Sequence, residues 1–182
     1  MKKLTQIFSQ WLLTIFLLAG LPFTAASQTA THLHFDGVND YAAVPTINFA
    51  NQSFTIEFWA KRTSFGTYQY VVSEGNFAPN QFLGIFFGLD DRIYLSFYNN
   101  DLGSSTAITD ANWHHYTFTY NNTTKLQAIY IDGVLDASRT TTANTTAAGP
   151  FYIGQAAFGG QTFSGNLEEL RVWNIERTGA AI

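Results

Sequence analysis

The chain has 182 residues, of which 12% are charged and 16% aromatic, and this composition is typical of one compact domain and excludes a disordered chain. A formal net charge of −4 argues against a nucleic acid partner. Because the sequence has no cysteine, a disulfide framework, a thiolate nucleophile and a Cys-ligated zinc site are all excluded.

The first segment predicts an export signal. Lys2 and Lys3 precede an apolar run over residues 11–21, which is too short for a membrane span, and small residues follow at 24–27. We expect residues 1–27 to be a cleaved signal peptide, with an uncleaved anchor as the alternative. Residues 28–182 are then a secreted or cell-surface domain without a transmembrane span, and losing both lysines lowers the formal charge from −4 to −6.

The remaining sequence predicts short strands separated by polar turns. Between residues 54 and 60, Phe54, Ile56 and Phe58 share one face of a strand, and Thr55, Glu57 and Trp59 share the other. No segment keeps apolar residues at helical spacing, so we expect an all-β, two-sheet antiparallel sandwich. The expected strands are residues 32–35, 41–44, 54–60, 69–73, 81–88, 92–98, 113–120, 125–131, 134–138, 151–154 and 166–173, with polar loops at 99–110 and 140–149.

Residues 113–133, WHHYTFTYNNTTKLQAIYIDG, form the clearest hairpin. Their Trp-His-His-Tyr start and the Asp132-Gly133 turn resemble the signature of the laminin-G-like, concanavalin A-type jelly rolls, which include the pentraxins. Residues 33–41, 54–61 and 163–173 match further motifs in the right order, so the resemblance covers about residues 31–182. It implies a concanavalin A-like jelly-roll sandwich. The end of the chain resembles an exit into another module, so the chain is either a lone domain or part of a longer multidomain protein.

The resemblance also implies a structural calcium ion between the first loop and the last strand. Its ligands would be Asp36, Asp40 and Glu168, since calcium takes oxygen ligands that loops supply well. Many relatives have aspartate where this chain has Glu168. The alternative is that Asp36 and Asp40 bind the backbone of their own turn, as aspartate commonly does.

The histidines and carboxylates favour no catalytic site. His114 and His115 point to opposite faces of one strand, so we expect a packed and a surface residue and no shared metal. Glycoside hydrolases need two carboxyl groups facing each other across the substrate. Glu57 stands alone on its strand, the neighbouring Glu168 and Glu169 face opposite sides, and no Gly-x-Ser-x-Gly elbow is present.

We therefore expect a non-catalytic recognition module that binds a glycan or a cell-surface glycoconjugate. Aromatic rings stack on sugar C–H surfaces, while amides and carboxylates bind the hydroxyl groups. The alternatives are a structural or adhesive spacer that contacts appended domains or surface proteins, and a glycoside hydrolase or polysaccharide lyase of the same fold. Loops rich in both residue types supply the candidate ligand-binding residues Tyr68, Tyr70, Phe77, Asn80, Tyr98, Asn99, Asn100 and Asp101.

Overall fold

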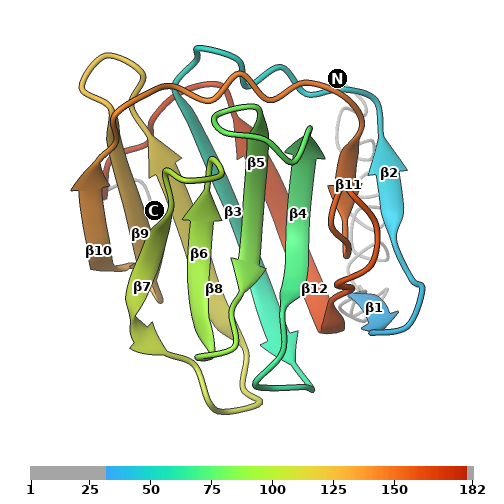
Figure 1. The fold of residues 1–182 in the computed structure, drawn as a ribbon. Coiled ribbons are helices and arrows are strands. Elements are labelled where there is room, and N and C mark those ends of the chain that lie inside the picture. Colours follow the sequence, from blue (N-terminus) through green and yellow to red (C-terminus); the bar gives the residue numbers. More distant parts are fainter. Residues whose placement is uncertain (1–31, 180–182) are drawn as a thin grey trace, which may run out of the picture. The chain divides into compact units, whose positions relative to one another are not determined.

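The structure, a computed structural model, describes residues 32–179 and folds them into two antiparallel sheets of six strands each (Figure 1). In spatial order, sheet A contains β1 (Leu33–Asp36), β12 (Ser164–Trp173), β3 (Phe54–Arg62), β8 (His114–Tyr120), β9 (Leu126–Ile131) and β10 (Val134–Thr140). Sheet B contains β2 (Ala42–Val44), β11 (Phe151–Ile153), β4 (Gln69–Gly75), β5 (Phe82–Phe87), β6 (Arg92–Ser96) and β7 (Leu102–Ala107).

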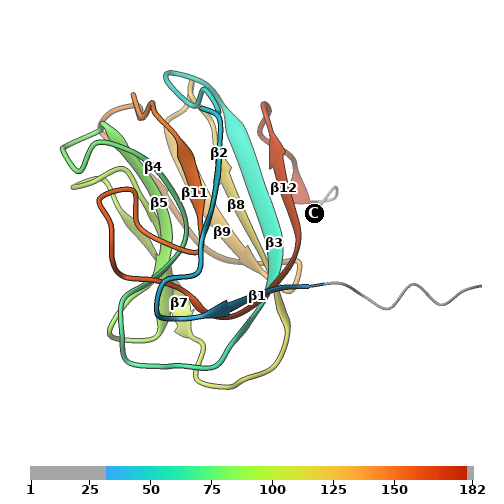
Figure 2. The same ribbon diagram turned by 90° about the vertical axis from the view of Figure 1, so that its right-hand side faces the viewer.

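The two sheets stack as layers, as Figure 2 shows from the side, and they confirm the expected jelly-roll sandwich. The predicted signal peptide, residues 1–27, lies outside the described residues. Among residues 32–179 there is no helix of the length and apolar character needed to cross a membrane.

Alternation of side chains builds the core between the sheets. Phe54, Ile56 and Phe58 on β3 are at most 1% exposed and pack against the inward residues of β8, where the rings of Phe58 and Phe118 stack at 5.8 Å. The predicted turn at Asp132-Gly133 is confirmed, since both residues have positive φ, at 51° and 78°. Local pattern and turn chemistry therefore agree in this hairpin.

Two sequence-based expectations are wrong. Residues 99–110, expected to be a loop, contain the edge strand β7, because backbone pairing with β6 tolerates its Gly-Ser-Ser-Thr composition. The alternation in residues 113–120 predicts that the second face of this strand is partly exposed to water. In the structure this face of β8, like the same face of β3, is largely buried because the chain after β12 crosses it. Thr55 Oγ1 donates to the Ile175 carbonyl at 2.8 Å and accepts from the Arg177 N–H at 2.9 Å.

His114, expected to pack in the core, lies at the start of β8 and is only half-buried. Its two ring nitrogens contact the carboxylates of Asp132 at 2.8 Å and Asp110 at 3.2 Å. Burial alone would lower the pKa of His114, but the two carboxylates outweigh it and raise the pKa. The residue thus holds a loop onto the hairpin turn.

One cation, Arg62, is buried in the interior, at 1% exposure. Its guanidinium donates to the Ile108 carbonyl at 3.0 Å and to Asp91 Oδ1 at 2.9 Å, and it lies 4.1 Å from the ring centroid of Phe87. Burial would raise the pKa of Asp91, but hydrogen bonds from the Gly66 N–H and Arg62 lower it. This ion pair fastens β3 to the turn that joins β5 and β6.

Glu74 on β4 is a second charge-bearing side chain that is fully buried. Neither carboxylate oxygen has a hydrogen bond of normal geometry within residues 32–179. Burial raises the pKa of Glu74 to about 7, and the nearby backbone N–H of Ile47 offsets only part of that effect.

Candidate functional site

The outer face of sheet B carries a band of aromatic side chains. In cross-strand register, Tyr70 of β4 lies opposite Phe86 of β5, which lies opposite Tyr94 of β6. Their ring centroids are 4.6 Å and 5.2 Å apart. We call the aromatic band the set formed by these rings and those around them, Tyr68, Tyr70, Phe77, Phe86, Tyr94, Tyr98 and Phe158.

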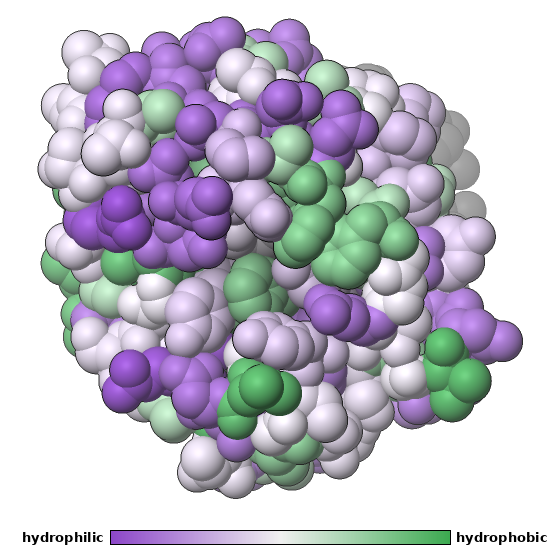
Figure 3. All heavy atoms as spheres, viewed as in Figure 1, coloured by the Kyte–Doolittle hydropathy of each residue, from purple (hydrophilic) through white to green (hydrophobic). Residues whose placement is uncertain are grey.

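The two-residue period of β5 explains why rings gather here. Leu83, Ile85 and Phe87 point inward and are fully buried, so Phe82 and Phe86 point to the outer face. In Figure 3 apolar side chains collect in the middle of this face, over β4 and β5. The outer face is therefore apolar because side chains on β5 alternate between its two faces and the outward ones include Phe82 and Phe86.

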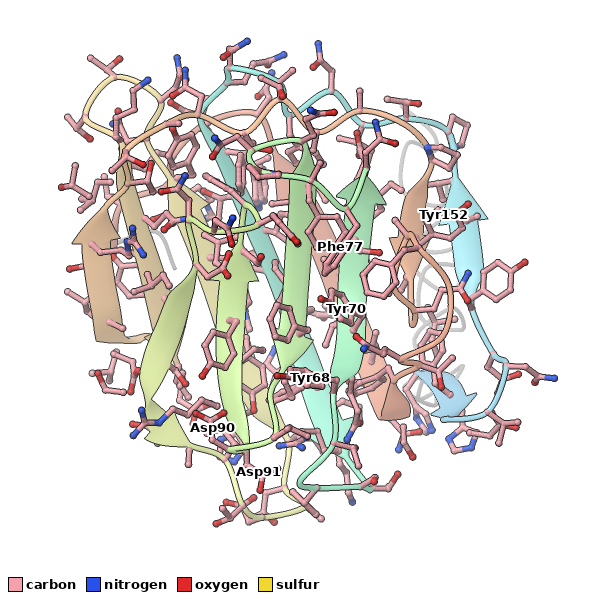
Figure 4. The ribbon with its side chains drawn as sticks, viewed as in Figure 1. Tyr68, Tyr70, Phe77, Asp90, Asp91 and Tyr152 are labelled. Carbon is pink, nitrogen blue, oxygen red and sulfur yellow. The ribbon has the colours of Figure 1, made fainter. Side chains whose placement is uncertain are left out.

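Phe77 marks the upper end of the band in Figure 4. Phe77 is 51% exposed and Phe158 43% exposed, and their ring centroids lie 4.4 Å apart. Tyr98 packs on Phe77 at 4.5 Å, and the fully buried ring of Phe82 lies beneath them. Rings held on both sides in this way present a firm apolar surface to solvent.

At its lower end the band meets polar groups. Tyr94 lies between two glycines: a Cβ on Gly88 would stand 2.8 Å from its ring, and a Cβ on Gly103 would stand 2.6 Å from it. The Tyr94 hydroxyl donates to Asp90 Oδ2 at 2.9 Å. Tyr68, which is 45% exposed, contacts Phe86 at 6.0 Å between centroids. Missing side chains at the glycines thus let the Tyr94 ring settle against the backbone.

Burial raises the pKa of two ring hydroxyls of the band, those of Tyr70 and Tyr94. Burial raises the pKa of Tyr70, and the charge of Asp101 and the nearby Tyr68 add to the rise. Burial and the hydrogen bond to Asp90 raise the pKa of Tyr94. Both hydroxyls are therefore neutral at physiological pH and able to donate and accept hydrogen bonds.

The structure brings part of the predicted ligand-binding set together. Tyr68, Tyr70, Phe77 and Tyr98 all belong to the aromatic band. Asp101 is exposed beside β6, where it accepts from the Ser96 hydroxyl at 2.6 Å.

The predicted amides have a different setting. The Asn100 amide donates to Asn80 Oδ1 at 2.6 Å and its own oxygen accepts from the Thr142 hydroxyl, so this pair braces three loops. Asn99 is exposed in the turn after β6, with φ of 66°. The sequence analysis missed Phe86, Tyr94 and Phe158. The one available signal was that Phe82 and Phe86, four positions apart, lie on the same face of a strand.

Two of the predicted metal ligands, Asp36 and Asp40, accept hydrogen bonds from backbone N–H groups of their own loop. Asp36 Oδ1 accepts from the Val38 N–H at 2.7 Å, and Asp40 Oδ2 accepts from the Asp36 N–H at 3.0 Å. Glu168 Oε1 lies 3.9 Å from the His32 ring. No group of three or more His, Cys, Asp or Glu that could hold a metal occurs in residues 32–179. The calcium site stays a prediction, in which backbone carbonyls or water would supply the remaining oxygen ligands.

A chelator tests the calcium prediction directly. If the Asp36 loop holds calcium, adding EDTA to the purified protein will lower the melting temperature, because a metal bound only to the folded state stabilises it. Differential scanning calorimetry, with Asp36→Asn as a variant that should no longer respond, provides the measurement. An identical melt with and without EDTA contradicts the prediction.

The glutamates considered for catalysis lie on sheet A and not beside the aromatic band. Glu57 is 3% exposed and its carboxylate is paired with Arg177 at 3.0 Å and with Arg171 at 3.4 Å. Glu168 lies opposite Trp59 in the pairing of β12 with β3. Through these ion pairs Glu57 holds the chain after β12 against sheet A.

Solved structures share this fold. A protein from Bacteroides ovatus matches with a TM-score of 0.63 at 19% identity, over 79% of this chain, which spans 44% of that protein. The CBM40 module of a Ruminococcus gnavus IT-sialidase was solved bound to alpha2,3 sialyllactose. It matches with a TM-score of 0.62 at 16% identity, over 76% of this chain and 95% of the module.

A third structure is domain 4 of AbnA, a GH43 extracellular arabinanase from Geobacillus stearothermophilus, in complex with arabinotriose. It matches with a TM-score of 0.61 at 18% identity, over 82% of this chain and 73% of the domain. A search of curated protein sequences finds no match.

At sequence level, residues 36–182 match a family model, and the matched segment runs from the last residue of β1 to the end of the chain. The matched segment contains residues 113–133 and 163–173, two of the stretches that resemble the family's motifs. The chain therefore belongs to the Laminin_G_3 family of the concanavalin A-like lectin/glucanases superfamily.

Proposed function

We propose that the protein is a non-catalytic, exported recognition module that binds a glycan on the aromatic band. The observation that carries the proposal is the run of partly exposed rings on the outer face of sheet B, where Tyr68, Phe77 and Phe158 are each 43–51% exposed. Sugar rings present C–H faces to aromatic surfaces, and such contacts need no charge on the protein.

Polar groups at the margins of the band suit sugar hydroxyls. Asp90 and Arg92 lie at the lower end, with Arg92 Nε 4.0 Å from Asp90 Oδ2, and Asp101 lies beside β6. These carboxylates can accept from hydroxyl groups, and the guanidinium can donate to them. A glycan chain lying along the band would meet an apolar centre and hydrogen-bonding margins.

Two similar structures, each solved with a bound sugar, support the same class of ligand. The R. gnavus module is described as bound to sialyllactose, and domain 4 of the G. stearothermophilus arabinanase as bound to arabinotriose. Because their identities to this chain are 16% and 18%, they support a glycan as the partner and leave its identity open. The expected leader, residues 1–27, would place the module outside the cell.

Binding tests start from a glycan array, followed by isothermal titration calorimetry on the hits. We expect Tyr68→Ala, Phe77→Ala and Phe158→Ala each to weaken binding by about 1–2 kcal/mol, or about tenfold, because each removes an exposed contact ring. Trp59→Ala is the matched control, since Trp59 is a 38% exposed aromatic residue on sheet A. Equal affinities for all four variants and the wild type would exclude the aromatic band as the site.

A further inference from the structure

A separate cleft lies at one end of the sandwich. It is enclosed by the loop between β2 and β3 and by the end of β12, and its volume is about 340 Å³. Figure 2 shows this loop and the end of β12 close together at the same end of the two layers. The volume falls within the range of about 300–1,000 Å³ that is usual for small-molecule sites.

The cleft is lined by apolar side chains and by polar side chains that include amides. The apolar part is formed by Ile47, Phe49, Phe54 and Val172, and the polar part by Asn48, Gln52, Ser53 and Asn174. None of the residues that line it is charged. A lining of this kind selects a ligand that is uncharged and has both an apolar side and hydrogen-bonding groups.

Two of the polar side chains are already used by the fold. Asn48 Oδ1 accepts from the Ala50 N–H at 3.0 Å, and Ser53 Oγ accepts from the Asn122 N–H at 2.9 Å. In contrast, the side-chain amides of Gln52 and Asn174 make no hydrogen bond to any residue in the described part of the chain. They are the groups of the cleft that remain available to a ligand.

Trp173 also lines the cleft, and its orientation is fixed from one side. The Arg177 guanidinium lies 4.5 Å from its ring centroid, and the charge of Arg177 is paired with Glu57 at 3.0 Å. The indole is 37% exposed. The charge of the cation behind the indole is thus paired with Glu57, and the indole adds an aromatic wall to the cleft without adding charge.

We propose that this cleft binds a single neutral sugar residue, held by the Gln52 and Asn174 amides against the indole of Trp173. A side-chain amide both donates and accepts hydrogen bonds, as a sugar hydroxyl does, so the two match without a charged group. The cleft lies on other residues than the aromatic band, and this proposal does not depend on glycan binding there.

The test uses ¹⁵N-labelled mature protein and two-dimensional NMR, with D-galactose, D-glucose, L-arabinose and N-acetylneuraminate as separate probes. We expect at least one of the three neutral sugars to shift the side-chain amide signals of Gln52 and Asn174 and the indole N–H signal of Trp173. Gln52→Ala and Asn174→Ala should each weaken that binding about fivefold to tenfold, as expected for a lost hydrogen bond. Both residues are at the surface, so the variants should fold.

The design separates this site from the aromatic band. Tyr68→Ala should leave the cleft shifts unchanged, and the two amide variants should leave binding at the band unchanged. Shifts at the cleft with N-acetylneuraminate alone would overturn the neutral ligand. No shift with any neutral sugar, or the same affinity in both amide variants, would overturn the site itself, whatever the result at the band.

Discussion

Replacing Arg62 with alanine is expected to lower the free energy of unfolding by about 3–5 kcal/mol, because it leaves buried partners without their cation. Asp91 would lose its hydrogen bond at 2.9 Å and the Ile108 carbonyl its bond at 3.0 Å. The substitution also empties the space that the guanidinium fills against the rings of Phe87 and Phe65. Loss of charge pairing and loss of packing therefore act in the same direction.

Chemical denaturation followed by tryptophan fluorescence measures this loss. Lys61→Ala is the matched control, because Lys61 is the neighbouring cation on β3 and is only half-buried. Its effect should stay within about 0.5 kcal/mol, as for most surface substitutions. If the Arg62 and Lys61 variants unfold at the same denaturant concentration, the buried ion pair contributes little to stability.

The second large effect is expected at Glu74, and it depends on pH. The pKa of this carboxyl is about 7 in the folded protein, against 4.5 for a glutamate in water, so near neutral pH the folded state keeps a proton that the unfolded state releases. Stability from this group is fully present below pH 4.5 and is lost as the pH rises through 7. Glu74→Gln has no charge to bury and should be more stable than the wild type by about 3 kcal/mol at pH 8.

Melting temperatures of the two proteins between pH 4 and pH 9 provide the measurement. At pH 4 the two should unfold alike, because the wild-type carboxyl is then protonated in both states. Glu169→Gln, at an exposed acid on β12, should leave the pH profile unchanged. Parallel profiles of Glu74→Gln and the wild type over the whole range would contradict the buried, protonated carboxyl.

Much of the fold could be predicted because its signals are local. The alternation from Phe54 to Ala60 and the positive-φ turn at Asp132-Gly133 depend only on neighbouring residues, and both are confirmed. β7 was missed since a glycine- and serine-rich edge strand is defined by its partner strand and not by its own side chains. The burial of Thr55 was missed because the residues that cover it, around Ile175, lie about 120 positions later in the chain.

Only part of the candidate site could be predicted from the sequence: Tyr70 on β4 was included, whereas Phe158 in the loop before β12 was missed. Tyr68, Phe77 and Tyr98 stood out as aromatic residues among polar neighbours. Phe86 and Tyr94 lie in strands where residues of both faces are apolar or aromatic, so the sequence alone cannot tell which face meets the other sheet. Arg62 and Glu74 were missed for a related reason, since their burial follows from contacts with distant segments.

The strict separation of inward and outward residues on β5 and β6 has a consequence for divergence. Substitutions at Phe86 or Tyr94 would change the outer aromatic surface while Ile85, Phe87 and Leu95 continue to pack in the interior. Exchange of Gly88 or Gly103 would tilt one ring and leave the hydrogen bonds between strands in place. The chemistry of this outer face can therefore vary while the packing between the two sheets stays the same.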